Sequence, residues 1–96
     1  MKNLKDYLEH QEKIWIDIYS KEDFTLFLQY AKENGCTWGH NKEIDPLKDK
    51  CNYYMSINNQ LQLSFVPAYC WYIKASNSPQ KYKFRELLGE NKWNKL

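Results

Sequence analysis

The fold is decided by residues 14–35, which read IWIDIYSKEDFTLFLQYAKENG. The three isoleucines stand at every second position, and the side chains of a strand alternate between two faces, so they share one face while Trp15 and Asp17 share the other. Ser20 can then accept hydrogen bonds from free backbone amides at the start of a helix, with Asp23 three positions later as in a capping box. The stretch predicts a half-buried strand that leads directly into a helix.

The predicted helix has one apolar stripe. Phe24, Phe27, Leu28 and Ala31 follow one another at the spacing of a helix face, and Gly35 can adopt the left-handed backbone conformation that ends a helix. This spacing is typical of a surface helix that docks on a sheet. We therefore expect the two phenylalanine rings to belong to the core.

The size and composition of the chain predict one folded domain. It has 96 residues, of which 43% are hydrophobic and 17% aromatic, more than a disordered chain carries and enough for one core but not for two. Residues 1–12 form a polar lead-in with a short helical stripe, residues 13–88 form the α+β core, and residues 89–96 form a polar tail. We expect a single domain over residues 1–96.

Further strands are predicted after the helix. Residues 36–38 form a short strand that ends at a turn. Residues 51–66 alternate between apolar and polar on both sides of Asn58-Asn59, as the two arms of a hairpin do. Residues 81–85 alternate again as a last strand, whereas residues 69–74 suit a strand or an irregular segment.

These elements follow one another in the order β-α-β-β-β-β. With only one main helix, the simplest architecture packs that helix on one face of an antiparallel sheet of four or five strands. The sequence therefore predicts an α+β fold.

The charge of the chain is close to balance. The formal net charge is +2, and of the 14 basic residues only Arg85 is an arginine, the side chain suited to bidentate contacts with phosphate or guanine. This composition neither requires nor forbids nucleic acid. No apolar run reaches the roughly 18 residues that span a bilayer, and the start MKNLKDYLEH is too charged for a signal peptide. We expect a cytoplasmic protein with no membrane partner.

Motifs for catalysis or metal binding are weak. Cys36, His40, Cys51 and Cys70 could bind zinc if the strands that carry them were neighbours, but strong zinc motifs have closely spaced ligand pairs that this sequence lacks. Cys36 and His40 also lack the flanking glycine loop of a nucleophilic site, and no phosphate-binding glycine motif is present. We expect no metal, no cofactor and no enzymatic activity.

The sequence has more aromatic side chains than one helix on one sheet can bury. Six of them crowd into residues 53–72, and alternation along a strand sends Tyr53 and Tyr54 to opposite faces. Two interpretations remain open. Either one sheet face exposes aromatic rings to a partner, or a second small core is closed by the N-terminal helix and Trp93.

The first interpretation defines a candidate binding surface. Exposed Tyr and Trp side chains often contribute more than about 2 kcal/mol each to a protein interface. Basic side chains beside them can serve as a charged rim, or can neutralise the backbone of a nucleic-acid strand whose bases stack on the rings. The candidate partner-binding residues are Trp38, Tyr54, Tyr69, Trp71 and Tyr72 as anchors, with Lys81, Lys83 and Arg85 as the rim.

Residues 13–88 resemble a group of small accessory proteins encoded by phages and mobile elements of low-GC bacteria. The resemblance rests on the strand, the acidic-capped helix ending in Asn-Gly, the short strand Cys36-Thr-Trp-Gly39, the hairpin and the closing segment Tyr-Lys-Phe-Arg-Glu-Leu. It implies a compact α+β fold and an accessory role. Many proteins of this kind block host defences, and anti-CRISPR inhibitors are among them.

The functional expectation follows from the aromatic surplus together with this resemblance. We expect a non-enzymatic phage or mobile-element protein that binds and inhibits a host defence protein in the bacterial cytoplasm, in particular an anti-CRISPR inhibitor of a CRISPR effector. The alternative is a small nucleic-acid-binding regulatory protein. A monomer and a homodimer are compatible with either function.

Overall fold

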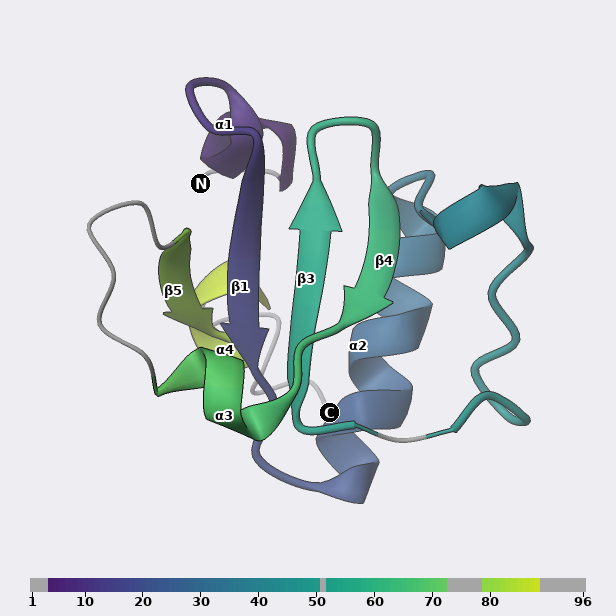
Figure 1. Ribbon diagram of the computed structural model, residues 1–96. Coiled ribbons are helices and arrows are strands. Elements are labelled where there is room, and N and C mark those ends of the chain that lie inside the picture. The colour runs from purple at the N-terminus through teal and green to yellow at the C-terminus, as the bar shows by residue number, and fades with distance from the viewer. Residues whose placement is uncertain (1–3, 51, 73–78, 89–96) are drawn as a thin grey trace.

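The structure, a computed structural model, describes residues 4–50, 52–72 and 79–88 (Figure 1). These residues form one five-stranded sheet with the strand order β2-β4-β3-β1-β5. The strands are β1 (Lys13–Asp17), β2 (Thr37–Trp38), β3 (Tyr54–Asn58), β4 (Gln62–Phe65) and β5 (Gln80–Lys83). The helices are α1 (Leu4–Leu8), α2 (Lys21–Glu33), α3 (Ala68–Trp71) and α4 (Phe84–Leu88), and a short 3₁₀ turn, η1, spans Gly39–Asn41. The α+β class is confirmed.

The strand and helix predicted from residues 14–35 are present. Ile14, Ile16 and Ile18 are all buried on one face of β1. Ser20 caps α2, because its Oγ accepts a hydrogen bond of 3.2 Å from the backbone N–H of Asp23. The helix ends at Glu33, and the following Gly35 has a φ of 82°, the left-handed conformation that its position requires.

The core lies on the sheet face that α2 covers. The apolar stripe of α2 packs there against inward side chains of β1, β3 and β4, including Met55, Ile57 and Leu63. Two shorter helices contribute to the same core: Leu4 and Leu8 come from α1, and Phe84 and Leu87 from α4. The expectation of one main helix was therefore wrong, because burial is shared by α1, α2 and α4.

The sheet is mixed, so the expectation of an antiparallel sheet was also wrong. β3 pairs antiparallel with both β1 and β4, but β5 pairs parallel with β1, and β2 pairs parallel with β4. In Figure 1 the arrows of β1, β4 and β5 point the same way and that of β3 points the opposite way. Of the neighbouring pairs, only β3 and β4 are joined by a tight turn, which forces the antiparallel arrangement. The direction of the other strands depends on longer connections.

The hairpin is confirmed, with a turn that differs from the expected one. The positive φ falls on Leu61, at 61°, rather than on the asparagines. The side chain of Asn58 organises this turn, because its Oδ1 accepts hydrogen bonds of 2.9 Å from the backbone N–H groups of both Gln60 and Gln62. An asparagine before the turn thus replaces the glycine that tight hairpins often use.

The segment after β4 is helical. Residues 69–74 suited a strand or an irregular segment, but Ala68–Trp71 form the one-turn helix α3 directly after Pro67; residues 73–74 lie outside the described residues. The last strand is shorter than expected, because the chain changes from β5 into α4 at Phe84, whose ring is buried. The predicted tail, residues 89–96, lies outside the described residues.

Candidate functional site

The sheet face opposite α2, here called the open face, carries the outward side chains of β1, β3, β4 and β5. One row across this face consists of Lys81, Trp15, Ser56 and Ser64, which are neighbours in the strand register. Side chains on one face at neighbouring positions of adjacent strands contact one another. Across the sheet the row thus begins with a lysine cation, continues with the large Trp15 ring and ends with two small serine side chains.

The helix α3 places Trp71 on the open face. The ring of Trp71 stacks on Tyr54 at a centroid distance of 4.7 Å and on Trp15 at 5.9 Å, with interplanar angles of 27° and 20°. Trp71 is only 9% exposed. It therefore serves as a buried platform that fixes α3 to the sheet rather than as a ring presented to a partner.

Lys81 completes this stack from β5. Its Nζ donates a hydrogen bond of 2.6 Å to the backbone carbonyl of Trp71 and lies 5.3 Å from the centroid of the Trp71 ring and 5.8 Å from that of Trp15. A cation within about 6 Å of an aromatic face is attracted by the negative charge of that face. Lys81 thus binds α3 to the edge strand, in addition to facing solvent.

Two tyrosines of this region project from the molecule. Tyr69 is 73% exposed and Tyr72 is 70% exposed, and both come from α3 or the residue after it. Tyr54 lies beneath Tyr72, and their hydroxyl oxygens are 2.7 Å apart in a hydrogen bond. This hydrogen bond, followed by partial burial and nearby charges, raises the pKa of Tyr54 to about 12. We call Tyr54, Tyr69 and Tyr72 the aromatic surface.

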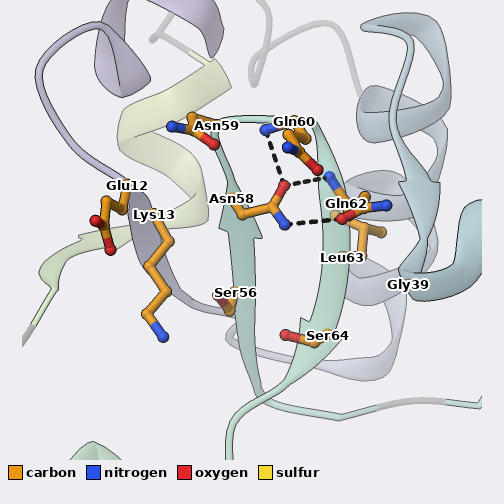
Figure 2. Close-up of a pocket in the computed structure, with 10 residues that line it drawn as sticks. All are labelled: Glu12, Lys13, Gly39, Ser56, Asn58, Asn59, Gln60, Gln62, Leu63 and Ser64. Atoms are coloured by element: carbon orange, nitrogen blue, oxygen red, sulfur yellow. Dashed lines mark hydrogen bonds between the residues drawn. The ribbon is translucent and has the colours of Figure 1, made fainter.

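A polar pocket lies on the open face (Figure 2), lined in part by Ser56, which is two positions from Tyr54 along β3. It has a volume of about 500 Å³, and its lining includes the small side chains of Ser56 and Ser64, which are neighbours in the strand register. Its floor is held by Asn58, whose Nδ2 donates a hydrogen bond of 3.0 Å to Oε1 of Gln62. The dashed lines in Figure 2 show that the Asn58 amide is bonded on both of its polar atoms. The pocket offers fixed hydrogen-bonding groups.

The other predicted site residues lie elsewhere. Trp38 stands on β2 at the opposite edge of the sheet, where its Nε1 donates a 2.6 Å hydrogen bond to Oδ2 of Asp49. Arg85 belongs to α4, where its Nε is 3.9 Å from the buried carboxylate of Asp23 and its guanidinium lies over the Tyr19 ring. Lys83 is exposed on β5. The structure thus brings together Tyr54, Tyr69, Trp71, Tyr72 and Lys81, and it separates Trp38 and Arg85 from them.

Sequence reasoning missed Trp15 as a member of this cluster. The sequence contained a signal for it, because alternation along β1 places Trp15 on the sheet face opposite to that of the buried isoleucines. The stacking of Trp15 on Trp71 also bears on the interpretation of a second small core. Such a core exists in part, but α3 closes it rather than α1, whose Leu4 and Leu8 pack in the main core. Trp93 lies outside the described residues.

The side chains considered from the sequence as zinc ligands do not form a cluster in the part of the chain that the structure describes. No group of three or more metal-binding side chains occurs among those residues. Cys36 is buried in the main core, where burial raises the pKa of its thiol to about 11, and Cys70 lies on α3; Cys51 falls outside the described residues. A thiol with such a pKa stays protonated and unreactive near neutral pH. None of the described helices is both long and apolar enough to span a membrane.

Comparison of the chain with protein-family models, with curated proteins and with solved structures finds no match.

Proposed function

We propose that this protein is a non-enzymatic binding protein that engages another protein through the aromatic surface of its open face. The observation that carries the proposal is the high exposure of Tyr69 and Tyr72, which lie on or next to the helix α3 that the buried Trp71 anchors to the sheet. Exposed apolar rings cost free energy in water unless a partner covers them. Rings held by a rigid platform also lose little conformational entropy on binding.

The surroundings of the aromatic surface suit a protein interface. Such interfaces have an aromatic centre and a polar rim whose hydrogen-bonding groups are already oriented. The aromatic surface supplies the centre. The polar pocket with Asn58 and Gln62, and Lys81 and Lys83 on β5, supply the rim.

The partner that we propose is a host defence protein, and the first to test is a CRISPR effector. This part of the proposal rests on the resemblance of residues 13–88 to accessory proteins of phages and mobile elements, and it assigns the protein to the cytoplasm of the infected bacterium. An inhibitor of this kind needs no catalytic residues, because occupying a functional surface of the effector is sufficient.

The test is a target-cleavage assay with purified CRISPR effectors, each loaded with guide RNA. We expect the wild-type protein to inhibit cleavage by one of them. Replacing both Tyr69 and Tyr72 with Ser removes two exposed rings. Each hot-spot ring contributes about 2 kcal/mol, so the concentration required for inhibition should rise by roughly 30-fold for one ring and by several hundred-fold for both.

The matched control is Leu47→Ser. Leu47 is 86% exposed and lies in the loop after Asp45, so the change removes one large exposed apolar side chain outside α3. Inhibition that survives the double tyrosine substitution would refute the assignment of the surface. A panel of effectors with no inhibited member would refute the assignment of the partner.

A second candidate function is binding of single-stranded nucleic acid. It is favoured by one specific observation: Lys81 and Lys83 extend from the same sheet face as Trp15 and Tyr54, because they are register neighbours of β1. A strand could place its phosphates on the lysines and stack bases on the rings. The affinity would then fall steeply as salt is added, whereas binding centred on aromatic side chains would not.

A further inference from the structure

A second pocket lies at the β2 edge of the sheet, separate from the aromatic surface. It has a volume of about 550 Å³ and is enclosed by β2, η1, the end of β4 and the loop up to Lys50. In Figure 1 this region lies at the side of the sheet away from β5 and α3. Ligand pockets typically have volumes of about 300 to 1,000 Å³, so a molecule of mononucleotide size can enter.

One wall of the pocket is aromatic. Trp38 and Phe65 meet edge to face at a centroid distance of 5.3 Å, and Phe65 remains 50% exposed. Asp49 fixes the indole, because its Oδ2 accepts a hydrogen bond from Trp38 Nε1 and another, of 2.8 Å, from the backbone N–H of Asp45. The wall is therefore oriented before any ligand arrives.

The lining of the pocket also contains basic side chains. Three exposed lysines line it, Lys42, Lys48 and Lys50, together with His40. Asp49 is the one carboxylate among the lining residues that the structure describes, and two N–H groups already engage it. Among the lining residues the three lysines outnumber the one carboxylate, which favours an anionic ligand.

The backbone next to the pocket adopts an uncommon conformation. His40 and Asn41 have φ values of 67° and 62°, the left-handed region that side chains other than glycine rarely adopt. A 2.8 Å hydrogen bond from the Trp38 N–H to the Lys42 carbonyl closes the chain around these two residues. Strain of this kind is concentrated at binding sites. Here it brings His40 and Lys42 to the same pocket.

We propose that this pocket binds a nucleoside phosphate. The aromatic wall of Trp38 and Phe65 receives the base, and Lys42, Lys48 and Lys50 receive the phosphates. An inorganic anion would leave the wall unused, and an uncharged aromatic molecule would leave the lysines unused. The same chemistry is offered by a free nucleotide and by the 5′-phosphorylated end of a single strand.

The test is a titration of the full-length protein with ATP. Binding is monitored by nuclear magnetic resonance of the backbone amides and tryptophan indoles. Adenosine and inorganic pyrophosphate are titrated separately as the two halves of the ligand, and a 5′-phosphorylated oligothymidylate represents a strand end. We expect saturable shifts of the Trp38 indole and of the amides of residues 39–50 with ATP, and binding at least about tenfold weaker for either half alone.

Two variants locate the site. Lys48→Gln with Lys50→Gln removes two exposed charges from the pocket, and we expect it to weaken ATP binding by about tenfold or more. The matched control is Lys5→Gln with Lys21→Gln, which removes two exposed charges on α1 and α2 and should leave the affinity unchanged. Because all four lysines are exposed, neither variant is expected to affect folding.

The inference is overturned if no saturable shift appears at millimolar ATP and with the oligonucleotide, if pyrophosphate or adenosine binds as tightly as ATP, or if the pocket variant binds ATP as the wild type does. Tighter binding of the oligonucleotide than of ATP, lost in the pocket variant, supports the site and identifies a strand end as the source. None of these outcomes depends on the aromatic surface, because Tyr54, Tyr69 and Tyr72 do not line this pocket.

Discussion

At the scale of single residues, Asp23 is the most unusual position in the structure. Its side chain is 6% exposed, and no group among the described residues donates a hydrogen bond to its Oδ2, although the Arg85 Nε lies 3.9 Å away. Burial raises the pKa of this carboxyl above its ordinary value, and the attraction of Arg85 opposes the rise only in part. The ionised carboxylate is therefore less stable in the folded protein than in the unfolded chain.

This burial gives the stability of the protein a defined dependence on pH. Because the pKa of Asp23 is higher in the folded state, ionisation destabilises the fold as the pH rises from the unfolded-state pKa to the folded-state pKa. Asp23→Asn cannot ionise, so we expect its free energy of unfolding to exceed that of wild type at neutral pH. The difference in the free energy of unfolding between the variant and wild type should disappear in acid. Urea unfolding at several pH values measures this difference.

The control for this prediction is Glu22→Gln, which removes an exposed charge from the neighbouring residue. It should not reproduce the same pH dependence. An Asp23→Asn variant that is less stable than wild type at neutral pH would mean that the pairing with Arg85 outweighs the cost of burial.

At the scale of elements, α3 determines what the open face can do. It has only one turn, so its own backbone hydrogen bonds cannot hold it in place. Its position depends on Trp71, which stacks between Trp15 and Tyr54 and accepts the Lys81 hydrogen bond on its carbonyl. The exposed tyrosines of the aromatic surface are therefore oriented by a buried tryptophan.

Removing this ring should be costly. We expect Trp71→Ala to lower the free energy of unfolding by about 3 kcal/mol, because truncation of a buried Trp typically costs that much. Tyr69→Ala, on the same helix but exposed, should change it by no more than about 0.5 kcal/mol. Urea unfolding, monitored by far-ultraviolet circular dichroism, gives the free energy of unfolding of both variants. Equal small losses would show that α3 is not anchored through Trp71.

The elements also show what a sequence can predict and where it stops. β1 and α2 follow from local signals, namely alternation, a Ser20 cap and an apolar stripe that ends near Gly35. The direction of β5 does not follow from local signals, because the residues of a strand do not indicate whether the neighbouring strand runs parallel or antiparallel. α3 was missed because four residues are too few to distinguish a helical from an alternating pattern.

At the scale of the whole molecule, the candidate site was predicted in composition but not in arrangement. Tyr54, Tyr69, Trp71, Tyr72 and Lys81 gather on the open face because β1, β3 and β5 are adjacent in the sheet. Trp38 was assigned to the same surface, but the sheet order puts β2 at the other edge. Such long-range neighbours depend on strand order, which local patterns do not contain.

The two faces of the sheet therefore have different roles. One is covered by α1, α2 and α4 and stabilises the fold. The other carries the aromatic surface and the polar pocket, and α3 packs on it. We propose that this open face binds a protein.

The most direct measurement is a pull-down from the lysate of a low-GC host bacterium, with nuclease and high salt, quantified by mass spectrometry. Wild type, Leu47→Ser and the double variant Tyr69→Ser with Tyr72→Ser are compared as bait. We predict that at least one host protein is retained by wild type and Leu47→Ser and is lost with the double variant. Equal retention by all three baits, or loss of every partner on treatment with nuclease and salt, would contradict the account.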